Sequence, residues 1–306
     1  MREIFQYIYR YFTNVPRIHL VCCALLTSIL VFLNYGYHLE TWLTSSLPLP
    51  FPDFTGHYIL FLTAFAIPYL LYKPLTGKNY LRHRMLLFLV VVAPALFALK
   101  MSMNTDLPLS TNAPWNDYWN KILYWPIRVV TLTFLLLIIW NLFDKKQPFY
   151  GLTAKNLHWR PYFIMLAIMI PLIALASTQA DFLAAYPKLH RILPLPESAA
   201  KSGWFYQMLF ELSYGSDFFS IELFFRGFLI LAFLRWAGKD AILPMACFYC
   251  TIHFGKPLGE CISSWFGGII LGIVVANTRS LYGGLMIHLG IAWLMELAAI
   301  LQHAAR

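Results

Sequence analysis

Charged residues are scarce in this sequence. Only 12% of its 306 residues are charged, whereas 59% are hydrophobic, and the mean hydropathy is +0.62. Such a chain has too little polar surface to cover a water-soluble globule. The composition therefore excludes a soluble enzyme or binding domain and predicts an all-α, polytopic transmembrane helix bundle.

Repeats and a disulfide framework are also lacking. No internal repeat recurs at a fixed period and no low-complexity tract occurs, so the inverted-repeat signature of many transporters is not apparent. The cysteines lie in apolar segments rather than in loops, which argues for buried free thiols, and no second cysteine pair stands at zinc-finger spacing. These cysteines are Cys22, Cys23, Cys247, Cys250 and Cys261.

Apolar runs are abundant instead. A membrane-spanning helix needs about 20 mostly apolar residues, and this template predicts eight or nine membrane segments. The expected segments cover residues 18–38, 58–71, 86–101, 122–142, 161–176, 205–236 and 241–254, followed by a glycine-rich helix and a helix around residue 288. The run 205–236 is long for one span, which predicts a tilt or a break near Gly215.

The net charge of +9 is distributed in alternate loops rather than in one patch for nucleic acid. Assigning basic loops to the cytoplasm places the turns near Arg82, Lys145, Lys239 and Arg279 on that side. Residues 1–17 are aromatic and basic and lack an obvious cleavage site, so we expect a cytoplasmic lead-in to the first span. The expected location is a multi-pass position in a membrane, with the lipid bilayer as a partner and no nucleic acid.

Ionisable residues in or beside apolar segments gather in the last hundred residues. This change of character divides the chain into N-terminal transmembrane helices, residues 1–203, and a functional core, residues 204–306. The ionisable residues of that core are Glu211, Asp217, Glu222, Arg226, His253, Lys256, Glu260, His288 and Glu296.

Glu222 and Arg226 lie four positions apart, a spacing that places two side chains on one face of an α-helix. An ionisable group at bilayer depth costs roughly 2.5–3.5 kcal/mol, so such a pair serves either as a structural ion pair or as a functional site. His253 and His288, each in an apolar segment, favour the functional interpretation. Glu260 is either a further site carboxylate or one half of a surface pair with Lys256.

Three motifs in this region resemble a known family. Glu-Glu-x-x-x-Arg, Phe-x-x-x-His and His-x-x-x-Asn/Asp on successive membrane helices mark the CAAX prenyl protease type 2 and bacteriocin-processing (CPBP, or Abi) intramembrane proteases. Here the motifs fall on residues 221–226, 249–253 and 288–292, and the resemblance covers residues 204–302. The run from His253 to Glu260 looks like a variant signature of a bacterial branch, which implies a bacterial inner membrane.

The chain departs from the family pattern at three positions. Ile221 stands where the family has the glutamate generally taken as the water-activating base, Tyr249 replaces the motif phenylalanine, and Ala292 replaces the final Asn/Asp. In such a branch Glu260 or Glu222 could supply the missing carboxylate. The resemblance implies catalytic roles for Glu222, Arg226, His253, His288 and Glu260.

The implied chemistry is hydrolysis of a peptide bond in a membrane-associated substrate. A carboxylate or a metal must activate water, and donors must stabilise the oxyanion. His253, His288 and Glu222 could form a three-ligand zinc site with an open position, although no His-Glu-x-x-His spacing occurs, so metal-dependent and metal-free glutamate catalysis both stay open. Two other classes also remain: a catalytically inactive scaffold that binds a peptide or membrane protein, and a transporter that uses these groups as an ion path.

Overall fold

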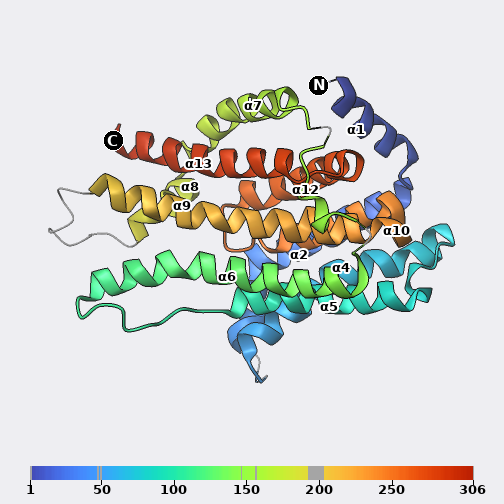
Figure 1. Cartoon of the computed structure of the whole chain (residues 1–306), viewed down its shortest axis with the longest axis horizontal. Helices are drawn as coiled ribbons and strands as arrows, with labels where there is room; N and C mark the ends of the chain where they lie inside the picture. Colours follow the sequence, from blue (N-terminus) through green and yellow to red (C-terminus); the bar gives the residue numbers. More distant parts are fainter. Residues whose placement is uncertain are drawn as a thin grey trace. The chain divides into compact units, whose positions relative to one another are not determined.

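The chain folds almost entirely into helices. The computed structural model describes residues 2–46, 48, 50–145, 147–155, 157–191 and 203–305. No strand occurs within these ranges, and Figure 1 shows that most of the chain is in long helices. The predicted all-α class is confirmed.

Long apolar helices make this an integral, multi-pass membrane protein. Among the described residues, 6 helices are long and apolar enough to cross a membrane. They are α2 (Arg17–Tyr37), α4 (Pro52–Thr76), α5 (Arg84–Ser102), α6 (Ala113–Phe143), α12 (Leu258–Thr278) and α13 (Tyr282–Ala304).

The predicted count of eight or nine segments is not confirmed. Helix α7 (Arg160–Ala176) has 17 residues and α11 (Ile242–Thr251) has 10, so both are shorter than the usual span. The run expected as one span is divided into α9 (Gly203–Glu222), the π-helix η6 (Leu223–Ala232) and α10 (Leu234–Ala237). Apolar composition located these segments, but composition alone does not fix how long each helix continues.

The remaining helical elements are short, apart from α1, which precedes the first span. They are α1 (Arg2–Asn14), α3 (Leu39–Thr41), η1 (Trp42–Ser46), η2 (Tyr80–Arg82), η3 (Phe149–Gly151), α8 (Ala180–Ala185), η4 (Lys188–Arg191) and η7 (Gly238–Ala241).

Proline and left-handed residues set the ends of the spans. Pro52 opens α4, where its fixed φ suits the first turn and its missing N–H is not needed. Gly77 ends α4 at φ 76°, a conformation that glycine adopts without strain, and its N–H bonds the carbonyl of Lys73. Pro257 precedes α12, and Arg279 closes α12 in the left-handed region.

The chain divides into two compact units. The first contains residues 1–102, 135–156 and 223–281, and the second contains residues 103–134, 157–222 and 282–306. One boundary falls between Glu222 and Leu223, where α9 gives way to η6. The functional division predicted after residue 203 stays a prediction.

The first unit is centred on aromatic rings. Phe248 of α11 lies 4.9 Å from Phe61 of α4 and 5.1 Å from Phe225 of η6, measured between ring centroids. Phe97 of α5 lies 4.9 Å from Phe224. Every residue of α11 and of η6 is buried. These two short helices therefore form the interior of the first unit, surrounded by longer ones.

The second unit is built around α13, which packs against α7 and α9 (Figure 1). Gly283 makes room for the ring of Tyr162, because a Cβ at that glycine would lie 2.0 Å from Cζ. Gly215 lets α9 approach Leu289 and Trp293 of α13 in the same way. The break predicted near Gly215 is wrong: α9 continues through this position, and the glycine permits close packing of two helices instead.

Candidate active site

Glu222 and His288 form a direct pair in the second unit. Glu222 is the last residue of α9, and His288 lies on α13; His288 Nδ1 is 2.9 Å from Glu222 Oε1. The side chain of Glu222 is 1% exposed and that of His288 is 13% exposed. The ring of Phe218 meets the imidazole edge-on at 4.7 Å. A buried carboxylate thus holds an imidazole that retains some exposure.

The backbone changes its helical form directly after Glu222. Residues Leu223–Ala232 form a π-helix, in which each N–H bonds the carbonyl five residues earlier. Such helices are rare and occur frequently at functional sites. The backbone from Leu223 onward is therefore π-helical rather than the α-helix that the predicted pairing of Glu222 with Arg226 assumed, and that pairing stays a prediction.

Arg226 lies over the ring of Tyr249 in the first unit. The Arg226 side chain is completely buried, and its guanidinium carbon is 3.9 Å from the ring centroid. A cation over an aromatic face at this distance is favourable, especially where water is excluded. Tyr249, the residue in the motif's phenylalanine position, therefore contributes its ring to holding the arginine.

His253 follows Tyr249 by one helical turn and is also buried. Its Nδ1 atom lies 3.0 Å from the Tyr249 carbonyl oxygen, and the two rings meet edge-on at 4.7 Å. When Nδ1 carries the proton, this contact is a hydrogen bond donated to the backbone, and Nε2 is the acceptor nitrogen of the ring.

The turn after His253 contains an ion pair between Lys256 and Glu260. Lys256 Nζ is 2.7 Å from Glu260 Oε1, and Glu260 stands in the first turn of α12, where a carboxylate interacts favourably with the helix dipole. The Tyr35 hydroxyl donates to the Lys256 carbonyl at 2.6 Å. This geometry fits a pair that stabilises the start of α12, and a catalytic role of Glu260 stays a prediction.

Part of the chain matches the model of a known protein family. Residues 203–294 match the Rce1-like family of type II CAAX prenyl endopeptidases. The match confirms the resemblance inferred from the sequence motifs, and it contains Glu222, Arg226, His253, Glu260 and His288. Neither the curated proteins nor the solved structures compared with this chain contain a match.

Two motif positions of the Rce1-like segment face an apolar environment. Ala292 is 4% exposed and belongs to a buried cluster in the second unit, against which Ile221 also packs. The buried members of this cluster are Tyr118, Ile122, Leu189, Phe210, Tyr214, Phe218 and Ala292. A charged or amide side chain at either position would lose solvation there. Ile221 and Ala292 therefore both suit the same apolar cluster.

The predicted site residues divide between the units. Glu222 and His288 belong to the second unit, whereas Arg226, His253 and Glu260 belong to the first. Two of the three predicted zinc ligands, Glu222 and His288, bond each other. Within the part of the chain that the structure describes, no group of three His, Cys, Asp or Glu side chains is arranged to hold a metal ion. Zinc stays a prediction, and the mechanism proposed for this chain uses protein groups alone.

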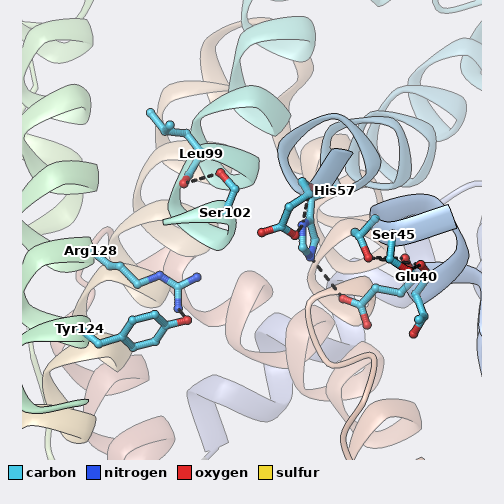
Figure 2. A network of polar contacts seen from close by, with 10 residues as sticks. Glu40, Ser45, His57, Leu99, Ser102, Tyr124 and Arg128 are labelled. Carbon is cyan, nitrogen blue, oxygen red and sulfur yellow. Dashed lines mark hydrogen bonds and ion pairs between the residues drawn. The ribbon is translucent and has the colours of Figure 1, made fainter. Parts of the chain in front are cut away.

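Sequence reasoning missed a group of ionisable side chains around His57. His57 Nε2 lies 3.5 Å from Glu40 Oε1, a contact drawn in Figure 2, and His57 Nδ1 lies 3.0 Å from Asp53 Oδ1. Asp53 and His57 are four residues apart on α4, which is a local signal. The contribution of Glu40 comes from a separate helix, so only the tertiary structure reveals it.

Proposed function

We propose that this protein is an intramembrane endopeptidase that hydrolyses a peptide bond of a membrane-associated substrate, and that it resides in a bacterial inner membrane. The Rce1-like match supports the endopeptidase class. The hydrogen bond between Glu222 and His288 carries the assignment of the reacting groups, because it joins a buried carboxylate to an imidazole at 2.9 Å.

In this proposal His288 transfers the proton and Glu222 positions it. Glu222 accepts a hydrogen bond from Nδ1–H and so holds the tautomer whose Nε2 is basic, as in other carboxylate–histidine pairs. Nε2 takes a proton from water while the resulting hydroxide bonds to the scissile carbonyl carbon. The carbon–nitrogen bond then breaks, and the imidazolium returns the proton to the departing amine.

The burial of Glu222 supports this division of roles. Its side chain is 1% exposed, so access to bulk water is limited, whereas the imidazole of His288 is 13% exposed. A pair of this kind can replace a missing first glutamate, the position at which this chain has Ile221. Glu222 is therefore a positioning residue, and His288 is the catalytic one.

The proposal can be tested by cleavage in ¹⁸O-labelled water. Full-length protein in lipid vesicles would be incubated with two panels of membrane-anchored peptides, one ending in a prenylated cysteine and one without prenyl groups. Hydrolysis places one ¹⁸O atom in each new C-terminal carboxylate, which mass spectrometry detects. We expect cleavage by the wild type and its loss in His288→Ala.

Glu211→Gln is the matched control, because Glu211 is a carboxylate on the same helix as Glu222. We expect Glu211→Gln to retain cleavage. If His288→Ala folds and cleaves at the wild-type rate, the assigned mechanism is wrong; if no peptide of either panel is cleaved by the wild type, the enzyme assignment fails.

A catalytically inactive scaffold is the alternative that one observation favours. Ile221 and Ala292 both pack with an apolar cluster in place of the family's polar residues. Such a protein would bind a peptide or membrane protein without cleaving it. Binding of an intact peptide from the panels, with no ¹⁸O incorporation, would support this alternative.

A further inference from the structure

Helix α1 carries an aromatic stripe on its outer face. Ile4 and Tyr11 are buried against the first unit, in which α1 packs on α12. Phe5, Tyr9 and Phe12 follow one another at helical spacing and are 64%, 72% and 42% exposed. With 13 residues, α1 is too short to cross a bilayer. A short helix with an exposed aromatic stripe and a polar opposite side is typical of helices that lie in the membrane interface.

Three basic residues belong to elements that pack together in the first unit: Arg10 is on α1, which packs on α12, Arg279 closes α12, and Lys239 bonds Asn277 of α12. Partial burial and the positive charges of Arg10 and Arg279 lower the pKa of Lys239. All three side chains are exposed. The Lys239 amine donates to the Asn277 side chain at 2.7 Å, and among the described residues no acidic side chain forms an ion pair with any of the three cations.

Mutually repelling cations on a surface are stabilised when an anion lies among them. The aromatic stripe indicates where that anion is, because tyrosine favours the headgroup level of a bilayer and phenylalanine is typical of the apolar face of helices that lie in the interface. One of the three cations, Arg10, is on α1 itself. A lipid headgroup phosphate would meet both requirements, whereas a phosphate ion in solution would meet only the first.

We propose that this end of the first unit is a docking surface for anionic lipid headgroups, with Phe5, Tyr9 and Phe12 in the interface and Arg10, Lys239 and Arg279 around the phosphate. The surface contains none of the residues assigned to the proposed proteolytic step and does not depend on that step. It would anchor α1 to the leaflet whose lipids carry negative charge, and its strength would fall with rising salt.

Amide hydrogen exchange of the full chain in lipid nanodiscs tests this proposal. One set of discs contains phosphatidylcholine alone, and the other contains about one third phosphatidylglycerol, an anionic lipid of the kind that attracts basic segments. We expect exchange over residues 2–14 to be several-fold slower in the anionic discs and the difference to shrink at high salt. Equal exchange in the two discs would overturn the proposal.

Variants separate this surface from a general effect of charge. Arg10→Gln/Arg279→Gln removes two of the three cations. We expect it to abolish the difference in exchange over residues 2–14 between the two kinds of disc. Lys155→Gln/Arg160→Gln removes the same charge from two exposed residues elsewhere in the chain and is expected to preserve the difference in exchange. A difference that persists in the first variant contradicts the proposal. Because both pairs are exposed, thermal unfolding should match the wild type and thus exclude misfolding.

A final arm distinguishes a lipid from a soluble anion. Inorganic phosphate is added to the phosphatidylcholine discs, and exchange over residues 2–14 is measured again. We expect no slowing, because free phosphate does not place the aromatic stripe in an interface. Slowing equal to that in the anionic discs would identify a site for soluble phosphate and overturn the docking surface.

Discussion

His288 Nδ1 lies 2.9 Å from Oε1 of Glu222, although the two residues are 66 positions apart in the sequence. The contact joins the end of α9 to the second turn of α13, two helices that also meet where Gly215 faces Leu289. A carboxylate taken out of water in this way needs a donor, and the imidazole supplies it. The contact therefore provides the buried carboxylate with a partner and is also suited to proton transfer.

Substitutions at Glu222 test whether it positions His288 for proton transfer. We expect Glu222→Gln to lower kcat for peptide cleavage by about 10²–10⁴-fold, the usual contribution of positioned proton transfer, and to leave KM nearly unchanged. Glu222→Asp retains the carboxylate and should recover part of kcat. Steady-state kinetics on any peptide cleaved by the wild type measures both constants. Equal rates for Glu222→Gln and the wild type would contradict the positioning role.

The contact of Arg226 with Tyr249 predicts a stability difference between two substitutions. Tyr249→Phe keeps a ring under the guanidinium and should retain most of the stability. Tyr249→Leu removes the ring and should destabilise the protein by about 2 kcal/mol or more, since a desolvated cation over an aromatic face contributes about that amount. Thermal unfolding in detergent compares the variants. A Leu variant as stable as the Phe variant would show that the ring is dispensable.

Substitutions at Lys256 and Glu260 test whether Glu260 has the predicted catalytic role. If the pair only stabilises the start of α12, Lys256→Gln and Glu260→Gln should cause the same small loss of stability, about 0.3–1 kcal/mol, and leave cleavage intact. We expect this result from the 2.7 Å ion pair. Loss of cleavage in Glu260→Gln alone, with normal unfolding, would instead assign a catalytic function to Glu260.

The zinc hypothesis makes a separate prediction for metal content. It requires near-stoichiometric zinc in the purified wild type and its loss in His253→Ala/His288→Ala, because these residues would be two of the three ligands. Elemental analysis of the detergent-solubilised proteins measures this directly. Equal, low zinc in both would leave hydrolysis by the Glu222–His288 pair or the inactive scaffold, which the ¹⁸O experiment separates.

Close helix packing at Gly283 predicts a large effect of one methyl group. Gly283→Ala would place its Cβ 2.0 Å from the Tyr162 ring, and we expect destabilisation of about 1–3 kcal/mol from overpacking. Gly267→Ala is the matched control, because nothing lies within 4 Å of the added Cβ. It should be neutral or stabilising by about 0.5–1 kcal/mol, given the helix propensity of alanine. Similar unfolding temperatures for the two variants would contradict this packing.

Several spans could be predicted closely because their ends are marked locally. The expected run 18–38 corresponds to Arg17–Tyr37, and 86–101 corresponds to Arg84–Ser102, where charged or turn residues interrupt the apolar sequence. The run 205–236 was harder to predict, since no local signal in the sequence distinguishes an α-helical from a π-helical turn at Leu223. Glycine at position 215 suggested a break, but α9 continues through it and approaches Leu289 and Trp293 of α13 there.

The sequence by itself determined the helical membrane class, through its scarcity of charge, and the Rce1-like segment, through motifs that are local in the chain. It also identified Glu222 and His288 as ionisable residues that need partners in an apolar setting. Only the tertiary structure decided that they are each other's partner, that Arg226 lies over Tyr249, and that α1 packs on α12. The reason is physical: composition and periodicity record which face of a helix is apolar, whereas the partner of a buried polar group depends on how separate helices pack.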